Sequence, residues 1–293
     1  MSRWTRRSFI RGTTQSAATA AMMGISCGPR LPGGADKEAF RDGGQAVVSL
    51  DGPWLFRTDP ERRGEARDWG APDAAGDGWE EVVVPSTWQV AAKTADYMGV
   101  AWYRRKFDAP LAWKKTVVRV EFEAVFHTAE VFVNGKRAGE HAGKGYTAFT
   151  IDISSLIEFG GANTIAVRVD NSFVPDMLPR GNSYDWTPDG GITRPVRLIV
   201  TPPVFIEHLW VDAVPDLGAG TAELSVTAVV RNATARETGV ELNGLVKEAA
   251  SGTVLTFGGA FLEEAIPAGA SREVRIAWDM AAPVKLWHFD HPH

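Results

Sequence analysis

Short runs of alternating apolar and polar residues dominate the chain from Val47 onward, and turn-forming residues separate them. In residues 117–123 (VVRVEFE) and again in residues 163–170 the apolar positions recur with a period of two. Because successive side chains of a strand point to opposite faces, this period predicts half-buried β-strands. Long amphipathic helical patterns are absent from the sequence. We therefore expect an all-β protein built from sandwiches.

Residues 131–153 (VFVNGKRAGEHAGKGYTAFTIDI) predict a hairpin followed by a third strand. Asn134 and Gly135 both tolerate the positive φ that a type I′ turn requires, so we place the turn there. His141 could line a pocket, but pairing with backbone near the turn is the favoured interpretation. The hairpin carries no evident catalyst, and a scaffolding role is expected.

Two consecutive prolines, Pro202 and Pro203, predict a break between domains, because neither can donate a ladder hydrogen bond. We expect one sandwich in residues 46–202 and a second in residues 203–293. Five strands are predicted in the second part, at residues 205–213, 222–232, 239–248, 254–257 and 271–278. An immunoglobulin-like sandwich has about seven strands, so the second domain is expected to be incomplete.

Residues 1–27 have the pattern of a bacterial export signal of the twin-arginine type. Arg6 and Arg7 precede an alanine-rich apolar run that is too short for a stable membrane anchor. Cys27 resembles the lipid-attachment cysteine of a lipoprotein, but Gly24 stands where a large aliphatic residue is usual, and both interpretations stay open. Residues 28–45 are expected to be a flexible linker. The expected location is periplasmic or extracellular.

The composition of the chain mainly excludes certain partners and sites. A chain of 293 residues with 44% hydrophobic and 23% charged residues is an ordinary soluble protein with two domains as the prior. The formal charge of −5 argues against nucleic acid as a partner. A single cysteine permits neither an internal disulfide nor a cysteine-based zinc site. His288, His291 and His293 could hold a metal, but an ordinary linker is the favoured interpretation, and no metal or cofactor is predicted.

Five motifs, in this order, resemble the N-terminal half of glycoside hydrolase family 2, the β-galactosidases and β-glucuronidases. They are LDGPWLF at 50–56, VVVPSTW at 82–88, YMGVAWYRRKF at 97–107, the hairpin with residues 163–171, and DGGITRPVRL at 189–198. The resemblance implies a galactose-binding-like jelly roll followed by an immunoglobulin-like β-sandwich. In the family a TIM barrel with two catalytic glutamates comes next. By this resemblance the chain would end before the barrel and before the last strands of the second sandwich.

Catalysis by this chain alone is not expected. Retaining glycosidases need two carboxyl groups about 5–5.5 Å apart. The family's acid/base glutamate follows an asparagine, and no Asn-Glu pair occurs in the sequence. The adjacent pairs Glu80-Glu81 and Glu263-Glu264 would point to opposite faces of a strand, so we interpret them as solvated charges.

Carbohydrate contact is the favoured chemistry, because pyranose rings stack on aromatic side chains and carboxylates bind their hydroxyls. Trp102 and Tyr103 are expected to fill the core instead. By resemblance, either Asp185 or Asp189 takes the position where this domain lends a carboxylate to the substrate pocket. The candidate contacts are Trp88, Tyr97, Tyr184, Asp185, Trp186 and Asp189.

Two functions stay open. The favoured one is the non-catalytic front of a family 2 β-glycosidase that helps to bind a β-linked carbohydrate. The alternative is a stand-alone exported carbohydrate-binding protein or lipoprotein without hydrolase activity. A weaker third hypothesis is structural, with a separately encoded barrel or a second copy of the chain completing the open sheet edge.

Overall fold

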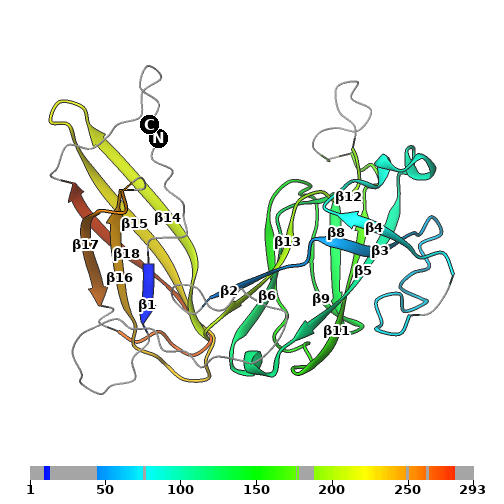
Figure 1. Ribbon diagram of the computed structural model, residues 1–293, viewed down its shortest axis with the longest axis horizontal. Coiled ribbons are helices and arrows are strands. Elements are labelled where there is room, and N and C mark those ends of the chain that lie inside the picture. Colours follow the sequence, from blue (N-terminus) through cyan, green and yellow to red (C-terminus); the bar gives the residue numbers. More distant parts are fainter. Residues whose placement is uncertain are drawn as a thin grey trace. The chain divides into compact units, whose positions relative to one another are not determined.

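The computed structural model describes residues 10–13, 45–74, 77–175, 177, 188–248, 251–261 and 264–280. The chain forms two compact units (Figure 1): residues 46–200 make one, and residues 1–45 with 201–293 make the other. Each unit is built from antiparallel strands. Three short 3-10 helices occur in the described part of the first unit: η1 (Trp88–Val90), η2 (Ala92–Thr94) and η3 (Leu111–Lys115).

Two antiparallel sheets pack face to face in the unit of residues 46–200 (Figure 1). The larger sheet has the order β4 (Glu80–Val84), β3 (Gly52–Thr58), β5 (Val100–Ala109), β11 (Gly161–Asp170), β8 (Thr128–Val133), β9 (Lys136–His141). The smaller sheet has the order β10 (Phe149–Asp152), β6 (Val117–Phe122), β13 (Val196–Thr201), β2 (Ala46–Ser49). A further pair joins β12 (Gly191–Ile192) to β7 (Val125–Phe126). This is the sandwich that the sequence predicted.

The core between these sheets comes from the apolar positions of the alternating runs. Val118, Val120 and Phe122 of β6 are fully buried, while the polar residues between them are partly exposed. Tyr103 of β5 lies in the same cluster, which confirms its predicted place in the core. Burying each large apolar side chain contributes about 1.5–3 kcal/mol, so the two inner faces supply the main driving force.

The hairpin of β8 and β9 turns at Asn134 and Gly135, which have φ of 50° and 80°. Both angles are positive, as a type I′ turn requires, so the predicted turn is confirmed. The Asn134 side chain also donates to the carbonyl oxygen of Leu156 at 2.9 Å and to Asn163 Oδ1 at 2.8 Å. One residue therefore sets the turn and ties it to the loop before β11.

Residues 59–74 and 77–79 lie on the outer face of the larger sheet, and we call them the covering segment. Trp69 from this segment packs on Trp102 of β5, and the Trp102 Nε1–H donates to Asp59 Oδ2 at 3.1 Å. Trp102 is buried as expected. It lies under the covering segment, however, and not between the sheets, because it neighbours the inward-facing Tyr103 on the strand.

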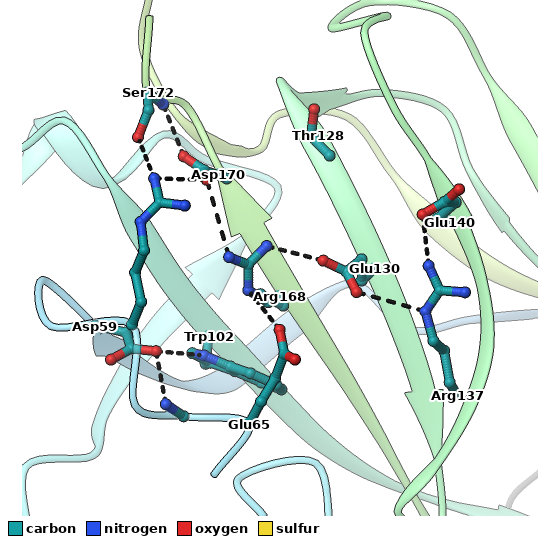
Figure 2. Close-up of polar contacts among 12 residues, drawn as sticks. Asp59, Glu65, Trp102, Thr128, Glu130, Arg137, Glu140, Arg168, Asp170 and Ser172 are labelled. Atoms are coloured by element: carbon teal, nitrogen blue, oxygen red, sulfur yellow. Dashed lines mark hydrogen bonds and ion pairs between the residues drawn. The ribbon is translucent and has the colours of Figure 1, made fainter.

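An ion-pair network pins the first half of the covering segment to the sheet. Figure 2 shows Arg168 of β11 between Glu130 and Glu65, at 2.9 and 3.2 Å. Asp170 accepts from Arg62 at 3.1 Å, and the same guanidinium reaches the Ser172 hydroxyl. Arg168 of the sheet thus binds Glu65 of the covering segment, and Arg62 of the covering segment binds Asp170 of the sheet.

The second unit is a β-sandwich of two three-stranded sheets within its described residues. Their orders are β14 (Val204–Asp216), β15 (Thr221–Asn232), β18 (Ser271–Met280), and β1 (Ile10–Thr13), β16 (Glu241–Lys247), β17 (Val254–Phe261). Leu224, Leu242 and Trp278 belong to the core between them. All five strands predicted after Pro203 are present. Strand β1 was not predicted; it lies within the expected export signal and pairs with β16.

Several expectations fall on residues outside the described ranges. They concern the signal residues Arg6 and Arg7, the lipidation candidate Cys27, residues 28–44 of the expected linker, the loop residues Tyr184, Asp185 and Trp186, the acidic residue Glu263, and the histidine tail His288, His291 and His293. These remain predictions from the sequence.

Candidate functional site

Three segments that are distant in the sequence meet beside the core of the first unit. They are residues 86–99 between β4 and β5, Asn171 after β11, and residues 188–192 around β12. The backbone N–H of Trp88 donates to the Gly190 carbonyl oxygen at 3.0 Å, and that of Ser86 donates to Ile192 at 2.9 Å. We call this assembly the loop cluster. It contains those candidate carbohydrate contacts that lie within the described residues.

Asn171 is fully buried and joins two of these segments. Its Oδ1 accepts from the backbone N–H of Gly99 at 2.8 Å, and its Nδ2 donates to the carbonyl oxygen of Pro188 at 2.9 Å. A buried polar atom that loses its partner costs about 1–3 kcal/mol, so this amide strongly favours one arrangement of the loops.

Gln89 makes a second clamp of the same kind. Its Nε2 donates to the Tyr97 carbonyl oxygen at 3.1 Å, while its Oε1 accepts from the Gly190 N–H at 3.0 Å. The sequence did not single out Asn171 or Gln89. Asn171 directly follows strand β11 and Gln89 lies in the short helix η1, and the role of each arises only when the three segments meet.

Trp88 does not fit its predicted role as an exposed stacking platform. Only 3% of the residue is exposed, and its ring packs against Phe56 and Tyr97 with centroids 6.0 and 6.1 Å away. The indole Nε1–H donates to the Tyr97 carbonyl oxygen at 3.0 Å. The ring therefore fills the core beneath the loop cluster, and the prediction is wrong because the loop folds inward over the sandwich.

Tyr97 is half-buried, and its hydroxyl donates to the Val100 carbonyl oxygen at 2.6 Å. Burial raises the pKa of this phenol above its ordinary value. The hydroxyl is thus committed to the fold, while the ring keeps part of its surface in solvent. Tyr97 remains an aromatic candidate of the loop cluster.

Asp189 stands between the two clamped neighbours Pro188 and Gly190. Its Oδ1 is buried and accepts no hydrogen bond from any residue that the structure describes. Burial raises the pKa of this carboxyl. The residue as a whole is partly exposed, so its carboxylate could accept a hydrogen bond from a ligand hydroxyl. Of the two aspartates left open by the sequence, Asp189 is the one whose surroundings are described.

The other acidic residues behave as surface charges. Glu80 on the edge strand β4 pairs with Lys93, and its neighbour Glu81 is exposed. Glu264 pairs with Arg272 at 3.1 Å.

His141 of the hairpin stacks on Phe149 with ring centroids 4.3 Å apart, and its Nε2 lies 3.0 Å from the Thr147 hydroxyl. Burial and the nearby Lys144 charge lower its pKa. Within the described ranges, no group of three potential metal-ligating side chains is found. The described residues also contain no helix with the length and hydropathy needed to cross a membrane.

Comparison with known proteins gives one family match. Residues 90–202 match the model of the glycosyl hydrolases family 2 sugar binding domain. This range includes most of the loop cluster and the strands that carry it.

The similar proteins are named β-galactosidases and β-glucuronidases. A β-galactosidase from Thermoanaerobacter pseudethanolicus is 32% identical over 210 residues, which are 69% of this chain and 26% of that protein. A β-glucuronidase from Bacteroides fragilis is 30% identical over 166 residues, 55% of this chain and 22% of that protein. The crystal structure of a Bacteroides uniformis β-glucuronidase superposes with a TM-score of 0.71 and 28% identity, covering 83% of this chain and 28% of the other. The chain thus spans about a quarter of the length of these curated relatives.

Proposed function

The chain belongs to glycosyl hydrolase family 2, and we propose that its loop cluster binds a β-linked carbohydrate. The observation that carries this proposal is the partly exposed Asp189 carboxylate, which stands between the two clamped residues Pro188 and Gly190. A sugar hydroxyl is a suitable donor for such a carboxylate. The clamps by Asn171 and Gln89 support the proposal, since they hold both neighbours of Asp189 in place.

We propose that the chain contributes carbohydrate binding, and not bond cleavage, to a family 2 enzyme. The relatives are named β-galactosidase and β-glucuronidase, and each is about four times longer than the matched part. We propose the corresponding β-glycosidase activity for the whole protein, with the two catalytic carboxyl groups supplied by a barrel domain. The choice between galactosides and glucuronides belongs to that domain.

Export through the twin-arginine pathway is also proposed, with Arg6 and Arg7 as the recognition pair and Cys27 as a candidate lipid anchor. The pattern suits both candidate functions, including the second, in which an exported chain holds polysaccharide without cleaving it. Cell fractionation of the full chain tests the location.

Sugar binding is tested by calorimetry and by nuclear magnetic resonance of the full chain with methyl β-galactoside and methyl β-glucuronide. An isolated domain with one aromatic contact should bind at roughly millimolar affinity, because association costs offset most of the contact energy. Asp189→Ala should abolish this binding. Asp108→Ala serves as the control, because Asp108 is an exposed carboxylate of β5.

Two results would contradict the proposal. One is the absence of any spectral change with either sugar, and the other is equal binding by wild type and the Asp189→Ala variant. Turnover of a chromogenic β-glycoside by the purified chain, lost on replacing one of its own carboxylates, would contradict the non-catalytic assignment.

A further inference from the structure

A groove opens on the outer face of the larger sheet where strands β3 and β5 part. The two strands pair from Leu55 opposite Arg104 to Thr58 opposite Ala101, and the pairing stops before Pro53. The groove has a volume of about 620 Å³. We call it the β3–β5 groove; its lining residues used below are Pro53, Leu55, Pro72, Glu81, Arg105 and Lys106.

Arg105 occupies the place where the strands separate. Its Nη1 donates to the carbonyl oxygens of Asp51 and Pro53, both at 3.1 Å. These carbonyls would otherwise lose their ladder partners, so the guanidinium completes the edge of β3 from the side. The charge is thereby fixed in the groove and retains further N–H groups for a ligand.

One wall of the groove is the second half of the covering segment. Arg104, only 6% exposed, holds this wall by donating to the carbonyl oxygens of Ala71, Pro72 and Ala74 at 2.6–2.9 Å. Its guanidinium also lies over the Trp79 ring at 5.2 Å. The first half of the segment is pinned by the network in Figure 2. The wall is therefore built in advance of any ligand.

The groove is lined by both charged and apolar side chains. Lys106 and Glu81 are exposed, and neither has an ion-pair partner in the described part of the chain. The lining side chains carry three positive charges (Arg104, Arg105 and Lys106) and two negative charges (Asp73 and Glu81), a net charge of +1, and Asp51 lies near Arg105. Leu55, 44% exposed, and Pro53 add a small apolar surface beside these charges.

We propose that the β3–β5 groove binds an acidic saccharide. Its carboxylate or sulfate group pairs with Arg105 and Lys106, as oxyanions do with guanidinium and ammonium groups. A ring hydroxyl donates to Glu81, and the apolar face of the sugar ring lies on Leu55 and Pro53.

Other ligand classes fit less well. A carboxylate beside the cations and a net charge of −5 disfavour nucleic acid. The exposed apolar surface, Leu55 with Pro53, is too small for a lipid chain.

The groove is a second site, separate from the loop cluster. None of the groove residues takes part in the clamps made by Asn171 and Gln89. The inference therefore goes beyond the proposed function and does not need Asp189. It gives the domain a contact for a charged stretch of polysaccharide.

The test titrates the full chain with a trimer of galacturonate, followed by calorimetry and by nuclear magnetic resonance. The neutral probe is cellotriose. We expect the acidic trimer to bind, with affinity falling as salt rises. Lys106→Glu should weaken binding about tenfold, because it replaces an attraction with a repulsion. Lys136→Glu, at an exposed lysine of β9 on the same sheet, is the charge-matched control and should bind like wild type.

Each outcome of these titrations either supports or contradicts the inference. Absence of binding, equal binding of cellotriose, or equal weakening by Lys106→Glu and Lys136→Glu would overturn the inference. The Asp189→Ala variant separates the two sites: it should keep the acidic trimer while losing the methyl glycosides. Thermal melting of each variant shows that the fold is intact, since both lysines are exposed.

Discussion

Replacing Gly190 by alanine should disrupt the loop cluster through a single added methyl group. A Cβ built on Gly190 lies 2.1 Å from Trp88 Cζ2 and 2.3 Å from Cη2. Carbon atoms in contact stay about 3.5–4.0 Å apart, so the indole would have to move by more than 1 Å. Trp88 has little room to do so, because its ring is buried and its Nε1–H is bonded to Tyr97.

The expected loss of stability depends on how firmly the Trp88 ring is held. Overpacking of a well-packed core costs about 1–3 kcal/mol, and the upper end applies where the contacted ring is held on several sides. For a domain of this size, each kcal/mol lowers the melting temperature by about 2–4 °C. We therefore expect Gly190→Ala to lower the melting temperature of the first unit by about 6–12 °C.

The measurement is urea unfolding and thermal melting of the full chain, followed by tryptophan fluorescence and near-ultraviolet circular dichroism. The matched control is Gly161→Ala at the exposed start of β11, where an added Cβ meets no atom within 4 Å. This variant should change stability by no more than about 0.5 kcal/mol. If the two variants unfold alike, the packing of Trp88 under Gly190 is not as described.

Two further predictions concern ionised groups. Asp189→Asn should raise stability at pH 7, and the difference from wild type should shrink as the pH falls. Because the pKa of the carboxyl is raised, the folded state keeps its proton to a higher pH than the unfolded state does. The stability of the wild type therefore declines as the pH rises through the folded pKa. Urea midpoints between pH 4 and 7 test this, and a constant difference would contradict it. Arg168→Met should cost about 1–3 kcal/mol, because Arg168 is 13% exposed and its loss removes one partner each from Glu130 and Asp170, which keep Arg137 and Arg62. Arg137→Met, half exposed on the same network, should cost at most about 1 kcal/mol in the same unfolding assay.

Much of the fold is readable from the sequence because most strands bury one face only. Alternation in β6 and the Asn134-Gly135 turn are local signals, and the structure follows them. Alternation is less informative where both faces of a strand are covered. In β5 the consecutive residues from Val100 to Arg104 are all buried, since the covering segment closes the outer face. The period of two predicts the strand but not which layer receives Trp102.

The loop cluster was less predictable for a physical reason. A tryptophan in a loop has the same local sequence whether its ring faces solvent or fills a core, so the expectation for Trp88 could not be decided locally. The amides of Asn171 and Gln89 gain their roles from partners 72 and 101 residues away, Gly99 and Gly190. Such contacts depend on which loops the sheet brings together, and the type of a residue does not predict which loops those are.

The two candidate sites rely on the same structural device. In the loop cluster, Asn171 and Gln89 satisfy backbone groups that no strand ladder reaches, and in the groove Arg105 does the same for the edge of β3. A β-sandwich leaves such groups unpaired wherever strands part or loops cross, and each must find a partner because an unsatisfied buried one is costly. Side chains recruited for this task are held rigidly, and they place polar atoms beside them at fixed positions. The places where the ladder fails are therefore where this fold can present ordered polar groups to a saccharide, which explains why both candidate sites lie there and not on the regular faces of the sheets.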